Sequence, residues 1–265
     1  MNPVPLHANN PGSIQGSGNW TWLLQGAVPT LIDAGTGEAA HLDSLEQALP
    51  DATLSQVLVT HGHVDHASGA PAISARFAGV QFRKVAWPGR DDQWPVRWKP
   101  IADGEELRSG DTTLVVLHTP GHAPDHVCFW HEPSRSLFGG DLVALGTTVW
   151  IPASMGGDLQ AYLASLQRIL ALNPLRIYPA HGPVIDDPAR LIHNYIEHRH
   201  ERERQILDAL RRGDAGVDAI TTRVYAQIPD VLVRLARETV SAHLAKLERE
   251  GRVGRTGESW HMIGP

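Results

Sequence analysis

Residues 60–69 read THGHVDHASG, and this stretch holds three histidines and an aspartate within six positions. It directly follows an apolar run of strand type, so these polar side chains come where a buried strand ends. His61 and His63 lie two positions apart in extended chain, so they point the same way and can share one ion. Asp65 and His66 come as the chain turns into a helix, and they face a neighbouring position. The density of the cluster and its place at a strand end therefore predict a metal site rather than chance surface decoration.

The strand in front of this stretch is one of several in the first part of the chain. From Asn19 to about residue 150, short apolar runs alternate with turns, and these runs predict strands. Helical stretches lie between them, and a longer helix is predicted after Asp158, which is a suitable N-cap. This order indicates a layered α/β domain whose chemistry lies in the loops at the strand ends. The predicted strands are WTWLL, PTLIDAG, LSQVLVT, VQFRKVAW, TTLVVLHT, HVCFW, SLFGGDLV and RIYPAHG, and the two shorter helices are HLDSLEQAL and APAISARF.

After about residue 190 the strand pattern nearly disappears. A charged helix, IEHRHERERQILDALRR, precedes a shorter helix over 217–225 and a third helix from Val231. The last residues alternate like a small hairpin. The sequence therefore predicts a catalytic domain over residues 1–190 and a small, mostly helical, winged-helix-like domain over residues 191–265. The apolar stripe of the third helix is Val233, Ala236, Val240, Leu244 and Leu247.

Composition sets limits on class and location. The chain has 265 residues, 42% of them hydrophobic, and a formal net charge of -6, so it can bury a full core and lacks the basic balance of a duplex-binding protein. Its single cysteine, Cys128, excludes an internal disulfide and a thiolate metal cluster, so a metal must be held by histidines and carboxylates. The first residues show no signal-peptide pattern, and no window approaches a membrane-spanning apolar run. We therefore expect a cytoplasmic protein with no membrane association.

The stretch THGHVDHASG contains the HxHxDH motif, and the chain resembles the metallo-β-lactamase superfamily over about residues 14–190. That family supplies its remaining metal ligands from three further strand ends, and all three motifs are present. HTPGH contains His122, LFGGD contains Asp141 and YPAHG contains His181. In LIDAG, Asp33 resembles a family aspartate that supports the metal loop. The resemblance implies an αββα sandwich.

The resemblance also implies a ligand set and a chemistry. Two divalent ions, expected to be Zn²⁺ although the same donors accept Mn²⁺ or Fe, would share a hydroxide that attacks the substrate. Asp65 would be catalytic as well, because it orients this water or moves its proton. One ion would be held by His61, His63 and His122 and the second by Asp65, His66 and His181, with Asp141 bridging the two.

The substrate is less clearly indicated by the family. A β-lactamase is disfavoured because no signal peptide is seen and because such enzymes generally lack an aspartate at the position of Asp141. That aspartate is typical of members that act on phosphodiesters, thioesters or lactones. Oxygen-reducing di-iron relatives carry Glu where this chain has His63, and a single-iron dioxygenase is a further, less favoured alternative. Our first hypothesis is a hydrolase of a small ester, thioester or lactone, which fits the acidic charge.

The tail resembles the group called β-lactamase-like protein 2, which includes an endoribonuclease that acts on single-stranded RNA. An endoribonuclease or other phosphodiesterase is therefore our second hypothesis, with arginines of the tail as phosphate contacts. Because glutamates are interleaved with these arginines, we interpret the tail mainly as a packing or cleft-wall module. A partner-binding protein with a vestigial site is a third hypothesis, and a homo-oligomer is left open. The arginines are Arg199, Arg202, Arg204, Arg211 and Arg212, and the nearby His193, His198 and His200 are interpreted as solvated.

Two further features have open roles. Trp87, Trp94 and Trp98 lie in a stiff aromatic insert, which either covers a sheet edge, forms a subunit contact or lines the substrate pocket. His126, four residues after His122, either supports the metal site, contacts substrate or is a buried structural histidine.

Overall fold

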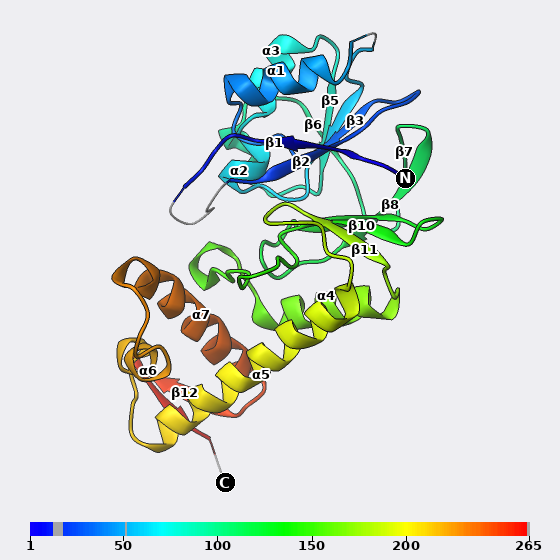
Figure 1. Cartoon of the computed structure of the whole chain (residues 1–265). Coiled ribbons are helices and arrows are strands. Elements are labelled where there is room, and N and C mark those ends of the chain that lie inside the picture. The colour runs from blue at the N-terminus through cyan, green and yellow to red at the C-terminus, as the bar shows by residue number, and fades with distance from the viewer. Residues whose placement is uncertain (13–17, 51, 264–265) are drawn as a thin grey trace.

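The structure is a computed structural model, and it describes residues 1–12, 18–50 and 52–263. Two β-sheets lie face to face, with helices on both outer faces (Figure 1). The first sheet has six strands in the order β1-β2-β3-β4-β5-β6, and the second has five in the order β11-β10-β9-β8-β7. The strands are β1 (Val4–His7), β2 (Trp20–Leu24), β3 (Thr30–Ile32), β4 (Gln56–Leu58), β5 (Gln81–Lys84), β6 (Trp98–Pro100), β7 (Glu106–Ser109), β8 (Thr112–His118), β9 (Val127–His131), β10 (Ser136–Gly140) and β11 (Arg176–Pro179).

Three apolar layers hold this sandwich together. One cluster, which includes Leu31 and Ile73, packs the first sheet against its outer helices, and a second, which includes Leu58 and Phe129, lies between the sheets. A third packs the second sheet against the helices on its far side. Strands between two apolar layers are covered on both faces, which is why all five residues of β9 and of β10 are buried. The outer helices are α1 (Ala39–Gln47) and α3 (Ala70–Arg76) on the first sheet, and α4 (Leu159–Ala171) and the start of α5 (Pro188–Arg211) on the second.

The predicted αββα sandwich is confirmed, and every predicted strand is present. Three strands were not predicted: β1, β6 and β7. Each of them is the edge strand of its sheet. Edge strands are short and partly exposed, so their sequences VPLH, WKP and ELRS lack the apolar pattern on which the prediction depends. The predicted cap of α4 is also present, because the Asp158 side chain accepts a hydrogen bond from the Ala161 N–H at 3.0 Å.

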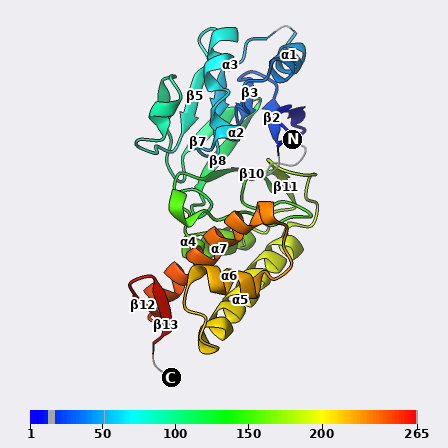
Figure 2. The same ribbon diagram turned by 90° about the vertical axis from the view of Figure 1, so that its left-hand side faces the viewer.

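The tail is helical and ends in a hairpin, as predicted (Figure 2). Helix α5 belongs to both parts of the chain. Ile192 and Tyr195 near its start pack on the sandwich, whereas Ile206 and Leu210 near its end lie in the core of the tail. Val233, predicted to be part of the buried stripe of α7, is 37% exposed instead. The other elements of the tail are α6 (Val217–Val224), α7 (Asp230–Arg249), β12 (Val253–Thr256) and β13 (Ser259–Met262).

No helix in the described ranges combines the length and the apolar character that crossing a membrane requires.

Gly69 closes the histidine-rich stretch of residues 60–69, and its size is essential. Its N–H donates to Gly35 O at 2.9 Å, and a Cβ at this position would overlap the backbone oxygen of Ala34 and lie 2.8 Å from Gly37 N. Because all these neighbours are backbone atoms, they cannot give way. We expect Gly69→Ala to lower the free energy of unfolding by about 3 kcal/mol, measured by urea denaturation. Gly216→Ala, at a site where an added Cβ meets open space, is the matched control and should cost under about 1 kcal/mol.

Candidate metal centre

Seven side chains named in the sequence lie together at one end of the sandwich, although they come from four separate stretches of the chain. The loop after β4 carries His61 and His63, and α2 (Val64–Ala67) carries Asp65 and His66. The other three come from the loops that follow β8, β10 and β11, which are His122, Asp141 and His181. Carboxyl ends of neighbouring strands meet at one edge of a sheet, so the fold brings these distant motifs to one point.

Three histidines form the first group. His63 Nδ1 lies 3.0 Å from His61 Nε2 and 2.8 Å from His122 Nε2. The other ring nitrogen of His122, Nδ1, donates to Trp150 O at 2.6 Å, so its Nε2 carries a free lone pair toward the group. Burial and the charge of His122 lower the pKa of His63 to about 2. The imidazoles are therefore neutral at physiological pH, which is the form that binds a metal.

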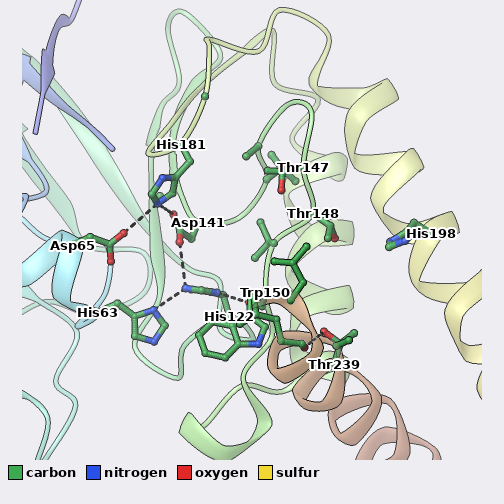
Figure 3. A pocket seen from close by; sticks show the side chains of 18 of the residues that line it. His63, Asp65, His122, Asp141, Thr147, Thr148, Trp150, His181, His198 and Thr239 are labelled. Carbon is green, nitrogen blue, oxygen red and sulfur yellow. Dashed lines mark hydrogen bonds and ion pairs between the residues drawn. The ribbon is translucent and has the colours of Figure 1, made fainter. Parts of the chain in front are cut away.

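Asp65, His66 and His181 form the second group. The Oδ2 atom of Asp65 lies 3.3 Å from His181 Nε2 (Figure 3). The same oxygen lies 3.6 Å from His66 Nε2. Burial raises the pKa of the Asp65 carboxyl, but the two histidines outweigh burial and hold the pKa below its ordinary value. Asp65 is therefore a carboxylate throughout the physiological range.

Asp141 lies between the two groups. Its Oδ1 is 3.4 Å from the Nε2 atoms of both His66 and His181, and its Oδ2 is 3.4 Å from His122 Nε2. Although burial raises the pKa of this carboxyl, the surrounding histidines hold it well below its ordinary value. One carboxylate thus faces both groups with a different oxygen.

The donor atoms fit divalent cations. His66 Nε2 and Asp141 Oδ1 are buried and form no hydrogen bond with any described residue, and their separation of 3.4 Å is long for one. Buried polar atoms without partners are costly, and a cation between them would satisfy both. Imidazole and carboxylate together suit Zn²⁺, Mn²⁺ and Fe. Three sets of side chains have donor atoms within 4.8 Å of one another, namely His61, His63 and His122; His61, His66 and Asp141; and Asp65, His66 and His181.

Asp33, named in the sequence as a support of the candidate metal loop, contacts that loop through two of its residues. Its Oδ1 accepts from the Thr60 N–H at 2.7 Å, and its Oδ2 lies 2.9 Å from His66 Nδ1. The bond to Nδ1 fixes the tautomer of His66 and turns Nε2 toward the cluster. Asp33 adopts φ 63°, a left-handed conformation that aspartate tolerates better than most residues.

A second support holds the peptide around Gly62, between the two histidines of the loop. The Gly62 N–H donates to Asp125 Oδ2 at 2.8 Å, and its carbonyl accepts from Arg90 Nε at 2.8 Å. Asp125 also pairs with Lys84 at 2.9 Å, and both side chains are fully buried. No specific role was predicted for Asp125. The loop is therefore fixed through its backbone as well as its side chains.

Removing Asp125 should destabilise the protein. We expect Asp125→Ala to lower the free energy of unfolding by about 3 kcal/mol, because it leaves the buried Lys84 ammonium with Asp91 as its single acidic partner among the described residues. The measurement is chemical denaturation of the variant beside Asp186→Ala, which removes an exposed ion pair with Arg176 and should cost under about 1 kcal/mol. Equal costs for the two variants would show that the Asp125 contacts do not stabilise the fold.

His126 supports the backbone of Asp141. It is completely buried. Its Nδ1 lies 3.1 Å from the Thr119 carbonyl, and its Nε2 accepts from the Asp141 N–H at 3.1 Å. Burial and the charge of His122 lower its pKa to about 3, so it is a neutral acceptor. His126 is therefore a buried residue that holds the Asp141 backbone, and it is not among the residues that line the cavity described below.

The three tryptophans of the aromatic insert have different surroundings. The Trp87 ring lies 6.0 Å from that of His63, between centroids. Trp94 and Trp98 pack instead on the core beneath the first sheet, and Trp98 contacts Phe82 edge-on. For Trp94 and Trp98 the structure favours the alternative of a cover at the sheet edge, because the insert forms the edge strand β6 and turns these rings onto the core.

Two models of known protein families match parts of this chain. The model of the metallo-beta-lactamase superfamily matches residues 14–181, and the model of the beta-lactamase associated winged helix domain matches residues 217–260. The chain belongs to the metallo-β-lactamase superfamily.

Similar proteins cover both the sandwich and the tail of this chain. The "Beta-lactamase-like protein 2 homolog" of Caenorhabditis elegans is 35% identical over 253 residues, covering 92% of this chain and 83% of the relative. The "Atrochrysone carboxyl ACP thioesterase" of Aspergillus chevalieri is 33% identical over 247 residues, covering 89% and 77%. A metallo-beta-lactamase family protein from Thermus thermophilus has the same fold, with a TM-score of 0.81, 22% identity and 98% coverage of both chains.

In this metallo-β-lactamase domain the cluster of candidate metal ligands opens into a cavity of about 710 Å³. One wall is the segment after β10, including Ala144 and Val149. The opposite wall belongs to the tail, including Tyr225, Leu232 and Leu235. The winged-helix part is thus a wall of the cavity. Beside the metal cluster, Arg90 also lines it, whereas the three tryptophans of the insert do not.

The sequence named Arg199 and Arg202 as possible phosphate contacts and the tail as a possible cleft wall, but it did not predict a basic lining for this cavity. His198, predicted to be solvated, lines it together with Arg199 and Arg202, and Arg199 is only 1% exposed. A signal was available, because Tyr195, Arg199 and Ile206 follow one another at helical spacing and continue one buried stripe through the charged run. The charges of that run made it look uniformly solvent-facing.

Proposed function

We propose that the chain is a dinuclear metal-dependent hydrolase, with zinc as the expected metal, that cleaves a small thioester. Its class as a metallo-β-lactamase-fold hydrolase follows from the family. The observation that supports a small acyl substrate is the cavity of about 710 Å³, whose walls are mainly apolar and which ends at the metal cluster. A relative named as a carrier-protein thioesterase supports a thioester over an ester or a lactone.

The proposed ligands are those the sequence named: His61, His63 and His122 for one ion, Asp65, His66 and His181 for the other, and Asp141 between them. Two such ions would supply a water of lowered pKa and would stabilise negative charge on the substrate oxygen. Side chains of the protein would accept protons and hold the proposed ligands in place around these ions. Asp65 Oδ2, a carboxylate 3.3 Å from His181 Nε2, accepts a proton at the open side of the cluster. Asp33 contacts His66, and His126 accepts a hydrogen bond from the Asp141 N–H. These contacts would fix the positions of the two proposed ligands.

The proposal is tested by the release of thiol from N-acetylcysteamine thioesters of increasing acyl length. We expect hydrolysis by the metal-loaded protein and none above background after chelation. Each methylene that enters the apolar cavity should raise kcat/KM by up to about fourfold, since a buried methylene contributes about 0.8 kcal/mol. Absence of hydrolysis across the series, with metal bound, would refute a thioesterase.

The exposed residues of the tail give less support to the alternative that the chain is an endoribonuclease. Several of its exposed arginines are paired with acidic neighbours, as Arg204 is with Glu201 and Arg212 with Asp208. Paired arginines give little net attraction for phosphates. Cleavage of an end-labelled single-stranded RNA that weakens steeply with salt would favour this alternative instead.

The division at residue 190, the cytoplasmic location and the possibility of a homo-oligomer also stay proposals. Size-exclusion chromatography with light scattering tests the last of these.

A further inference from the structure

Two arginines of α5 face the cavity without an acidic partner in the part of the chain that the structure describes. Arg199 and Arg202 both line it, and the Nε atom of each is buried and forms no hydrogen bond within the described ranges. Three exposed arginines of the same helix and its C-terminal end differ, because Arg190, Arg204 and Arg212 each pair with a carboxylate three or four residues away. The two arginines on the cavity face thus keep their charge free for a ligand.

Nearby carboxylates do not neutralise these arginines. Glu203, the buried carboxylate on α5, forms ion pairs with Lys246 at 2.6 Å and with Arg252 at 2.5 Å. Arg199 donates instead to Thr148 Oγ1 at 3.2 Å and to the Val149 carbonyl, which fixes it against the cavity wall. A fixed guanidinium in a partly dry pocket attracts an anion far more strongly than one in water.

The surroundings of Arg202 also favour the binding of an anion. Its guanidinium lies 4.6 Å from the centre of the Tyr225 ring, which also lines the cavity, and donates to Gln205 at 2.7 Å. His198, one turn before it on α5, lines the cavity too. Figure 3 shows His198 on the opposite side of the pocket from His63 and Asp65, with Thr147 and Thr148 between.

The cavity therefore has two charged ends. Its acidic lining residues are Asp65 and Asp141 of the metal cluster, and the walls between the ends are apolar, with Val149 and Leu235 as examples. Burying cations without counterions is costly, and a ligand that brings its own anion would offset that cost. Arginine is suited to this task because its planar fork binds carboxylate or phosphate through two hydrogen bonds.

We propose that His198, Arg199 and Arg202 form an anion subsite, which binds a carboxylate or phosphate group carried by the substrate away from its scissile bond. The substrate class is then an acyl compound in which an apolar segment separates the reactive carbonyl from the anion. The inference that the anion and the reactive carbonyl belong to one molecule rests on the proposed function.

The subsite is tested by calorimetric binding to the full-length, metal-loaded protein, which needs no turnover. The probes are octanoate, octyl phosphate and the neutral octanamide. We expect the wild type to bind at least one anion about tenfold or more tightly than octanamide. Arg202→Gln should weaken that binding by about tenfold to a hundredfold and leave octanamide within about twofold. Arg202→Lys should retain part of the preference, because it keeps the charge.

Arg204→Gln is the matched control, because it removes one charge from the exposed face of the same helix and should change none of the affinities. Arg202 is chosen over Arg199 because Arg199 is buried and its loss endangers folding. A loss confined to octanoate or to octyl phosphate would identify the anion. Anion binding that Arg202→Gln leaves unchanged would place the anion on the metal ions and overturn the inference. A wild type that binds the anion through Arg202 but hydrolyses no thioester would instead refute the proposed function and keep the subsite.

Discussion

Asp65→Asn should lower kcat/KM for thioester hydrolysis by about 10³- to 10⁴-fold, the largest loss we expect from any isosteric change. The amide keeps the shape of the side chain but lacks the charge, and it cannot accept the proton that we propose Asp65 Oδ2 takes up beside His181. Because the pKa of Asp65 is held below its ordinary value, this role is available throughout the physiological pH range. The measurement is steady-state thiol release.

Asp92→Asn is the control, since Asp92 is exposed and lies outside the cluster. We expect this variant to match the wild type, and we expect both variants to melt within about 4 °C of it. Asp65→Asn with more than a tenth of wild-type activity would show that the carboxylate has no catalytic part in the reaction.

Asp141→Ala should prevent the binding of the two ions that we propose for the site. Asp141 faces His122 with one oxygen and both His66 and His181 with the other, so its loss removes a proposed ligand from both groups at once. We expect the purified variant to hold fewer than two ions per chain and kcat/KM to fall by about 10³-fold or more. The measurement is elemental analysis of the dialysed protein beside the kinetic assay.

Asp33→Asn provides a graded comparison. Asp33 touches the cluster through His66 alone, so its change should weaken metal affinity by about tenfold to a hundredfold and leave the number of sites unchanged. If Asp141→Ala retained two ions with wild-type affinity, Asp141 would not be a shared ligand.

Much of the fold was predictable because the central strands are buried on both faces. Such strands carry continuous apolar runs, as in HVCFW and SLFGG, and the cap at Asp158 marked the start of α4. The strands β1, β6 and β7 were not predictable, because edge strands lie half in water and carry polar residues. The role of the tryptophans in the insert stayed open for a related reason: aromatic side chains mark a pocket and a sheet edge equally well, and Trp98 packs on Phe82.

The cluster was predictable to a greater degree than its surroundings. Ligand-type residues at short spacing carry their chemistry in the sequence, and each follows a strand. Asp125, for which no role was predicted, supports the loop through the Gly62 N–H, and such a backbone contact leaves no sequence pattern. The basic cavity lining depends on how α5 is rotated about its axis. That rotation is fixed by Tyr195 and Ile206, which are buried in two different cores.

The most direct test of the dinuclear hydrolase is metal titration of chelator-treated protein, with bound ions and thioester hydrolysis measured on the same samples. We predict that the wild type binds two divalent ions per chain and that hydrolysis rises from background as both sites fill. Full activity without metal, or with a single ion bound at saturation, would contradict a dinuclear centre.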